Sequence, residues 1–404
     1  MRSISADWLY TGTGLPQFNS GVLVAADGRI ASIGQRGQDG EHFPSAVLIP
    51  GLVNAHTHLE LTGFEGQNEE LEFPRWIRRI IALKAGRSEE DFFHAARTGL
   101  QSSFASGVTT VADTGSSAGP LRALAELGGS GTAYLEVFGP HPDAAVANMA
   151  AFEARLAELS VYESPRIRLG VSPHAPYSVS SPLYRATAQL ARNQHRRLAV
   201  HIAESEAESD LLERAAGPFA EMWRSREIPL PALPGRTPLA WLETHEVLGP
   251  ETLCIHAVRA DASDIARLGR HRCGVAHCPR SNRRHGQGDA PLRGFREAKL
   301  RVGIGTDSAA SVSPPDLLAE ARAAAVLAGL SAPEALHLAT QGGADAIGLG
   351  REVGRIEPGK WADLALIRLP EGVSAGSLAD AILASSLEDV VATFVSGRSV
   401  YHEK

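Results

Sequence analysis

Two histidines separated by one residue, His56 and His58, follow a short apolar segment in the stretch PGLVNAHTHLE at residues 50–60. Side chains along a β-strand alternate between its two faces, so residues i and i+2 project from the same face. Neutral imidazole is a common metal ligand. The spacing therefore favours a metal site at the end of this strand.

Further histidines follow other β-rich segments. Six of the 15 histidines lie at the C-terminal ends of such segments, and the other nine fall in predicted helices, loops or the tail. The six are His56, His58, His174, His201, His256 and His277. For His277 alone, a hydrogen-bonded core histidine is the favoured interpretation. Together with Asp307, the set offers imidazole and carboxylate ligands that suit zinc or iron.

The elements that must position these residues form a regular alternation. Eight β-rich segments lie at 52–58, 107–113, 131–138, 166–177, 197–205, 252–258, 273–282 and 300–311. Helical patterns separate most of them, such as residues 88–107, where Ser88 and Asp91 fit an N-terminal capping motif. This alternation predicts an α/β fold, a (β/α)8 TIM-like barrel, with an open doubly wound sheet as the alternative. Active sites of such barrels lie at the C-terminal ends of the strands, where the histidines are expected.

Both ends of the chain have a different pattern. GVLVAADGRIASIG at residues 21–34 places two β-rich runs around an Asp27–Gly28 turn, which indicates a hairpin. Residues 352–404 contain the strand-like runs WADLALIRL and VVATFVSGRSVYHEK. Neither end can bury a core alone. We therefore expect 1–48 and 352–404 to form one small β-sandwich beside a catalytic barrel of residues 49–351.

Composition excludes several classes of protein. The 404 residues are 44% hydrophobic and 21% charged, which is typical of a globular enzyme. The net charge of −7 and the absence of a run of five like charges argue against nucleic-acid or membrane binding. The N-terminus lacks a signal-peptide core and no segment has 18 apolar residues, so we expect a cytoplasmic protein. The three cysteines have no CxxC spacing and are interpreted as buried apolar residues.

The lysines bear on the number of metal ions. A two-metal version of such a barrel generally needs a bridging carboxylate, often a carboxylated lysine on an interior strand. The chain has only Lys84, Lys299, Lys360 and Lys404, and none falls at a predicted bridging position. One catalytic metal is therefore expected. A homodimer is the default expectation for an enzyme of this size.

Six motifs occur in a characteristic order: PGLVNAHTH, SPHAPYS, HIAE, IHAV, HCPRSN and GTDS. This ordered set resembles the amidohydrolase superfamily, specifically its mononuclear branch of cytosine, guanine and S-adenosylhomocysteine deaminases and triazine hydrolases. DGRIASIG and EPGKWADLALI resemble the sandwich strands that flank such barrels, so the resemblance spans nearly the whole chain.

The resemblance implies roles for individual residues. The implied ligands of one divalent metal, zinc first and iron as the alternative, are His56, His58, His201 and Asp307. Glu204 would carry a proton to the leaving nitrogen, and His256 and Asp307 would help to activate a metal-bound water. The alternative for Glu204 is a helix N-terminal carboxylate stabilised by the helix dipole. His174, Tyr177 and Asn282 would face a small-molecule substrate.

Among the branches, the sequence most resembles the 6-amino-6-deoxyfutalosine deaminases of menaquinone biosynthesis. That nucleoside carries an adenine ring and a benzoate carboxylate, and arginine suits bidentate carboxylate recognition. Arg280, Arg283 and Arg284 in PRSNRRHG are candidates for this contact. Trp76, which lies with Arg78 and Arg79 on a predicted lid segment, could stack on the purine or belong to the core.

The expected reaction is deamination of an aminopurine nucleoside by metal-bound hydroxide, with release of ammonia. The segment WIRRIIALKAG lacks the acidic residue that the S-adenosylhomocysteine deaminases have for ribose, which weakens an assignment to S-adenosylhomocysteine or adenosine. Cytosine or guanine deamination and triazine or lactam hydrolysis stay as alternatives. A non-catalytic binding protein would be expected to lack several of the ligands, whereas all of them occur here.

Overall fold

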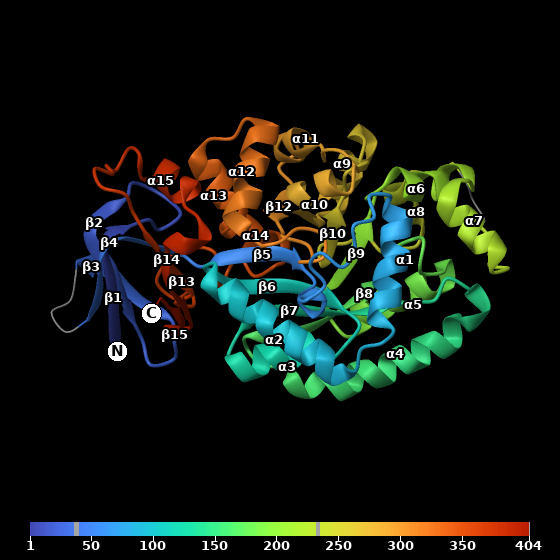
Figure 1. The fold of residues 1–404 in the computed structure, drawn as a ribbon, viewed down its shortest axis with the longest axis horizontal. Helices are drawn as coiled ribbons and strands as arrows, with labels where there is room; N and C mark the ends of the chain where they lie inside the picture. Colours follow the sequence, from blue (N-terminus) through green and yellow to red (C-terminus); the bar gives the residue numbers. More distant parts are fainter. Residues whose placement is uncertain (36–39, 232–234, 404) are drawn as a thin grey trace.

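Two units lie side by side in the computed structural model, which describes residues 1–35, 40–231 and 235–403. A barrel surrounded by helices forms the larger unit, and a β-sheet built from both ends of the chain lies against one side of it (Figure 1). The predicted combination of a (β/α)8 barrel with a small β-domain is confirmed.

The barrel consists of eight parallel strands in sequence order around the sheet. They are β5 (Leu52–Thr57), β6 (Val108–Gly115), β7 (Ser130–Val137), β8 (Ile167–Pro173), β9 (Leu198–Ile202), β10 (Thr252–His256), β11 (Gly274–His277) and β12 (Arg301–Ile304). A parallel bridge between Thr57 and Asp307 joins the first strand to the segment after the last one. The two sheet edges therefore meet, which excludes the open doubly wound sheet.

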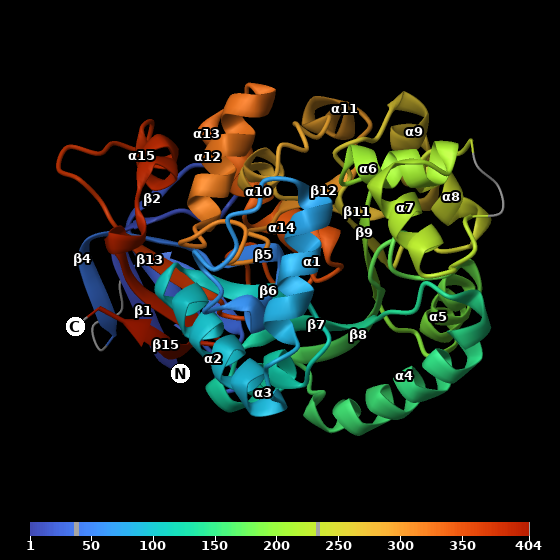
Figure 2. The same ribbon diagram turned by 45° about the vertical axis from the view of Figure 1, so that its right-hand side comes forward.

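Helices cover the outside of the barrel (Figures 1 and 2). They are α2 (Glu89–Ala105), α3 (Gly119–Leu127), α4 (Ala145–Leu159), α5 (Ser181–Asn193), α6 (Glu206–Ser209), α7 (Gly217–Ser225), α8 (Pro238–Thr244), α9 (Ala262–His271), α10 (Pro279–Arg284), α11 (Leu292–Glu297), α12 (Leu317–Ala328), α13 (Ala332–Leu338) and α14 (Gln341–Ala346). Ser88 and Asp91 form the predicted capping box of α2. All six residues of β5 are buried, as expected for a parallel strand covered on both faces.

Helix α1 (Phe73–Lys84) lies in front of the strands in both views (Figures 1 and 2). Its buried Phe73 and Trp76 belong to an apolar cluster with Tyr177, from the loop after β8, and Phe219 of α7. At its C-terminal end, Lys84 donates a hydrogen bond to the buried Glu60 at 2.5 Å. Apolar packing and one buried ion pair thus hold α1 on the barrel.

The smaller unit is a mixed sheet of seven strands in the order β15-β14-β13-β4-β1-β2-β3. Its strands are β1 (Arg2–Leu9), β2 (Gln17–Val24), β3 (Ile30–Gln35), β4 (Glu41–Pro50), β13 (Leu364–Arg368), β14 (Val390–Val395) and β15 (Arg398–His402), and α15 (Leu378–Ala384) precedes β14. Antiparallel pairing of β2 with β3 confirms the predicted hairpin. The predicted boundary between residues 48 and 49 falls inside β4.

Several predicted strands end earlier than expected, among them the two that precede Asn282 and Asp307. Residues 273–282 were expected to be extended, but β11 ends at His277 and α10 begins at Pro279. Proline suits the first turn of a helix because the N–H that it lacks has no intrahelical partner there. Likewise, β12 ends at Ile304, and Asp307 lies in the following loop. Within the described residues, no helix is long and apolar enough to cross a membrane.

Candidate active site

The two histidines of the HxH motif lie beside Asp307 at the seam of the barrel. The distance from Asp307 Oδ1 to His56 Nε2 is 3.5 Å, and to His58 Nε2 it is 3.6 Å. His56 is fully buried, and neither of its ring nitrogens has a hydrogen-bond partner within the described residues. Buried polar atoms are rarely left without partners, so His56 is a candidate ligand for an ion.

His58 and His201 point their Nε2 atoms at each other across 3.3 Å. Each ring donates its Nδ1 hydrogen to a backbone carbonyl, that of Thr114 for His58 (2.8 Å) and that of His174 for His201 (3.2 Å). A carbonyl can only accept, so each Nδ1 carries a hydrogen and each Nε2 of the neutral rings carries a lone pair. Two ligands on tetrahedral zinc, with bonds of about 2.0–2.1 Å, lie roughly 3.3–3.4 Å apart. The site therefore fits a divalent metal.

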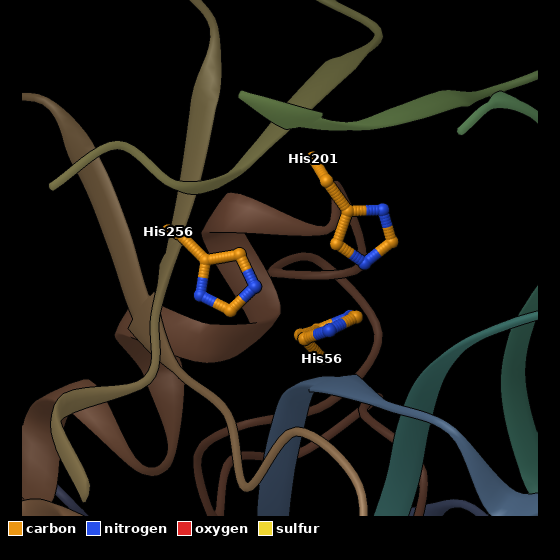
Figure 3. A group of neighbouring side chains, drawn as sticks. All are labelled: His56, His201 and His256. Atoms are coloured by element: carbon orange, nitrogen blue, oxygen red, sulfur yellow. The ribbon is translucent and has the colours of Figure 1, made fainter. Parts of the chain in front are cut away.

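Potential ligands form three groups within the described residues, each with its ligand atoms within 4.8 Å of one another, and two of the groups share His56. One contains His56, His58 and Asp307, and the other contains His56, His201 and His256 (Figure 3). Burial lowers the pKa of His56 to about 3. Burial also lowers the pKa values of His201 and His256, so these three rings are neutral at pH 7, the form that binds metals. Sequence reasoning placed His256 as a catalytic residue, and its distance also allows it to be a ligand.

Asp307 is held as a carboxylate. Burial alone would raise its pKa, but His56, His58 and His256 together lower the pKa well below its usual value. Ser281, on α10, donates a hydrogen bond to Oδ2. This leaves Oδ1 facing the histidines, as a metal ligand requires.

Glu204 lies beside His256, a member of one of these groups. His256 Nε2 is 3.5 Å from Glu204 Oε1, and Gln287 donates a hydrogen bond to the same oxygen at 3.0 Å. Burial and the charge of Asp307 raise the pKa of Glu204 to about 8. A carboxyl group of this kind can exchange protons near neutral pH.

Asn282 connects two of the histidines. Its Oδ1 accepts a hydrogen bond from His256 Nδ1 at 2.9 Å, and its Nδ2 lies 3.5 Å from His277 Nδ1. His256 therefore carries its proton on Nδ1 and presents a free Nε2 to Glu204. Both hydrogen-bonding atoms of the Asn282 side chain are engaged, so a contact of this amide with substrate stays a prediction.

The backbone around these residues adopts left-handed conformations. The φ angles are 52° at Ala203, 71° at His256, 48° at Ala257 and 55° at Asp307. Such φ values are uncommon for residues other than glycine and persist where the surrounding structure enforces them. Glu208 helps to enforce the first turn by accepting the backbone N–H groups of Ala203 and Glu204, at 2.8 and 3.0 Å.

On the other side of the site lie His174 and Tyr177. His174 Nδ1 is 2.7 Å from the hydroxyl of Ser178, which is bonded in turn to the carbonyl of Ala175. Its ring packs on Phe138 and His201, at centroid distances of 4.8 and 4.9 Å. The structure thus places His174 beside the metal-binding group, while Tyr177 is buried against Phe219 at 4.2 Å.

The remaining predicted substrate contacts have protein partners. Trp76 is buried and packs edge-on against His285 at 4.6 Å. Arg280 lies 3.7 Å from the buried Glu320, and Arg283 pairs with the exposed Asp289 at 2.9 Å. Their contacts with substrate stay predictions.

Several polar residues at the site were missed by sequence reasoning, namely Glu136, Glu208, Ser281 and Gln287. Ser281 belongs to the HCPRSN motif and precedes Asn282. Glu136 is the one charged residue in the fully buried strand β7, which is itself a signal of function. Gln287 has no comparable signal, because its link to Glu204 joins residues 83 positions apart.

Comparison with known proteins gives one family and several relatives. Residues 47–400 match the amidohydrolase family. The aminodeoxyfutalosine deaminase of Deinococcus radiodurans is 32% identical over 331 residues, which cover 77% of each chain. The 5-methylthioadenosine/S-adenosylhomocysteine deaminase of Syntrophobacter fumaroxidans is 29% identical over 411 residues, covering 96% of this chain and 90% of the relative.

Among solved structures, an adenosine deaminase from Xanthomonas campestris with bound zinc superposes with a TM-score of 0.84 at 24% identity, covering 98% of this chain and 92% of the other. Its likeness extends over both the barrel and the small β-domain.

Proposed function

Because this chain belongs to the amidohydrolase family, we propose that it is a metal-dependent deaminase of an aminopurine nucleoside, with 6-amino-6-deoxyfutalosine as the first candidate substrate. Family membership and the deaminase relatives identify a hydrolase of carbon–nitrogen bonds. The observation that carries the proposal is the pairing of Glu204 with His256, at 3.5 Å, beside the histidine–aspartate group.

The proposed ligands of one metal ion are His56, His58, His201 and Asp307. Three neutral imidazoles and one carboxylate suit zinc, and iron is compatible with the same donors. When bound, a divalent metal supplies a Lewis acid and lowers the pKa of a coordinated water from about 15.7 to about 7. Zinc is our first choice because the Xanthomonas campestris deaminase contains it.

Glu204 is the proposed proton carrier. Its carboxyl group is buried, and its raised pKa, about 8, keeps a proton available at neutral pH. Glu204 first protonates a ring nitrogen, which makes the adjacent carbon more electrophilic. It then takes from His256, across 3.5 Å, the first proton that water loses and delivers it to the departing amine, and the second water proton restores the carboxyl group as ammonia leaves. His256, with its free Nε2, is the proposed acceptor of the proton that water loses.

The first substrate candidate rests on the relative from Deinococcus radiodurans. The nucleoside that the sequence resemblance implies carries a benzoate carboxylate, for which Arg283 is the proposed partner. The Arg283–Asp289 pair is exposed, and such pairs typically contribute only about 0–1 kcal/mol. Arg283 can therefore exchange Asp289 for a ligand more readily than Arg280 can leave the buried Glu320. A role in menaquinone biosynthesis stays a prediction of the resemblance.

A second candidate activity is deamination of 5-methylthioadenosine or S-adenosylhomocysteine. The relative from Syntrophobacter fumaroxidans favours it, because the match covers nearly the whole of both chains. Both candidates share the purine amine and differ at the 5′ substituent.

Ammonia release by the purified, zinc-loaded protein tests the proposal. The substrates are 6-amino-6-deoxyfutalosine, 5-methylthioadenosine, S-adenosylhomocysteine and adenosine, assayed side by side at equal concentration. Fast release from the first alone supports the first candidate, and preference for the second or third supports the alternative. No release from any of them, with zinc shown to be present, would refute the nucleoside assignment.

A further inference from the structure

Glu136 is a buried carboxylate that the proposed chemistry does not use. It lies near the C-terminal end of β7, is 7% exposed, and its Oε1 has no hydrogen-bond partner within the described residues. Its carboxylate lies in one group with His174 and His201, whose potential ligand atoms are all within 4.8 Å of one another. A buried carboxylate without a partner is costly, so its presence points to a ligand.

The nearby cation is already engaged. Lys84 Nζ donates to Glu60 at 2.5 Å and to Ser116 at 3.1 Å. His58, another neighbour, uses its Nδ1 for the carbonyl of Thr114. Within the described residues, neither Lys84 nor His58 donates a hydrogen bond to Glu136 Oε1.

A second metal ion is a poor match for this group. His201 Nδ1 is bonded to the carbonyl of His174, so His201 has only Nε2 to offer. That atom faces His58 Nε2 at 3.3 Å in the first metal group. One nitrogen lone pair cannot serve two ions. Glu136 and His174 are thus left to meet a ligand that donates hydrogen bonds.

We propose that Glu136, beside His174, forms a subsite that accepts hydrogen bonds from the ribose hydroxyls of the substrate. This inference rests on the proposed function. The purine ring of an aminopurine nucleoside presents acceptor nitrogens, and its amine must lie at Glu204 and His256. The donors that remain are the 2′- and 3′-hydroxyls of the sugar. Phe138, two residues after Glu136, packs on His174 and is 42% exposed, so this side of the site borders solvent, where the 5′ substituent can extend.

The test compares ribose with deoxyribose in the zinc-loaded wild type and in Glu136→Ala, Glu136→Gln and the exposed control Glu206→Gln. For each protein, kcat/KM is measured for the best nucleoside substrate and for its 2′-deoxy and 3′-deoxy analogues. Dissociation constants are measured for a coformycin-type inhibitor and its 2′-deoxy form, and zinc is counted per chain.

The wild type and Glu206→Gln should prefer the ribonucleoside by roughly 10- to 100-fold, as expected for a hydrogen bond to a charged group. In Glu136→Ala this preference should fall to within about twofold in both kcat/KM and inhibitor binding, with zinc unchanged, and Glu136→Gln should retain part of it. Partial misfolding does not affect the ratio of kcat/KM for the ribonucleoside to kcat/KM for its deoxy analogue, because both are measured on the same protein sample.

Three results would overturn the proposal. An undiminished ribose preference in Glu136→Ala would show that another group recognises the sugar. Two zinc ions in the wild type and one in Glu136→Ala would make Glu136 a metal ligand. If the zinc-loaded wild type deaminates no nucleoside at all, the proposed function fails and the subsite fails with it, a result distinguishable from the other two.

Discussion

The two sides of the barrel mouth differ in how their carboxylates are paired. On the β9–β12 wall, formed by Glu204, His256, Asn282 and Asp307, each side chain has a partner within the wall or from α10 and the following loop. On the β7–β8 wall, formed by Glu136 and His174, the carboxylate oxygen Oε1 has none. A paired wall fixes the orientation of groups that transfer protons, whereas an unpaired one leaves bonds for a ligand to make. The contrast agrees with the proposals that one wall transfers protons and the other binds the sugar.

Removal of Asp307 should have the largest effect. In Asp307→Ala the proposed metal group loses its only carboxylate, so we expect zinc to be lost and activity to fall by at least ~10³-fold, equivalent to several kcal/mol. Elemental analysis and ammonia release measure the two losses together. Zinc at the wild-type level with full activity would contradict the ligand assignment.

Glu204→Gln should lower the turnover rate without removing the metal ion from the site. Loss of a general acid–base group typically lowers the rate by ~10²–10⁴-fold. The amide keeps the size of the side chain, and Glu204 is not a proposed ligand, so zinc content should not change. A zinc-free variant would instead identify Glu204 as a ligand.

The pH dependence of kcat/KM should show an alkaline limb that belongs to Glu204. The protonated carboxyl group is the proposed active form, so activity falls as pH rises through its pKa, which burial raises to about 8. A bound cation favours the carboxylate, which places the limb at or below this value.

Gln287→Leu then provides a test of that assignment. Gln287 donates to Glu204 and lowers its pKa, so the substitution should move the limb to higher pH and reduce kcat/KM by roughly tenfold. A limb at the wild-type position in Gln287→Leu would assign the titration to another group.

Arg283→Ala should give the smallest and most selective change. If Arg283 binds the substrate carboxylate, KM for 6-amino-6-deoxyfutalosine should rise by roughly tenfold, while 5-methylthioadenosine, which lacks a carboxylate, should be unaffected. Arg293→Ala serves as the control, because Arg293 is an exposed arginine on helix α11. Equal effects on both substrates would remove Arg283 from the binding site.

The sequence predicts the barrel and the strand-end histidines well because both depend on local patterns. The apolar run before His56 and His58 predicts a strand, and the two histidines mark its end. His201 and His256 follow apolar runs in the same way. The roles of Ser281 and Gln287 depend instead on which loops meet over the barrel. Ser281 was also expected to be in an extended segment, whereas it lies in α10. Pairing of this kind is set by tertiary packing, which periodicity does not encode.

The arginines illustrate the same limit. PRSNRRHG shows three cations close together in the sequence but not their partners. The structure gives Arg280 the buried Glu320, on α12, a helix that lies 40 positions further along the chain. Without that partner in view, Arg280 and Arg283 were equivalent candidates for a substrate carboxylate.

The seam of the barrel, where the Thr57 hydroxyl bonds to the carbonyl of Asp307 across 250 positions of sequence, also connects function to folding. His56 and Asp307 stand on opposite sides of that seam, so their carboxylate–imidazole group forms only when the first and last strands meet. An ion that binds there would link the first and last strands. It would raise the free energy of unfolding of the closed barrel by an amount that grows with the free concentration of the ion. Metal affinity would then report on the integrity of the whole ring of strands, and chelation should lower the melting temperature of the barrel before any change at the small β-sheet.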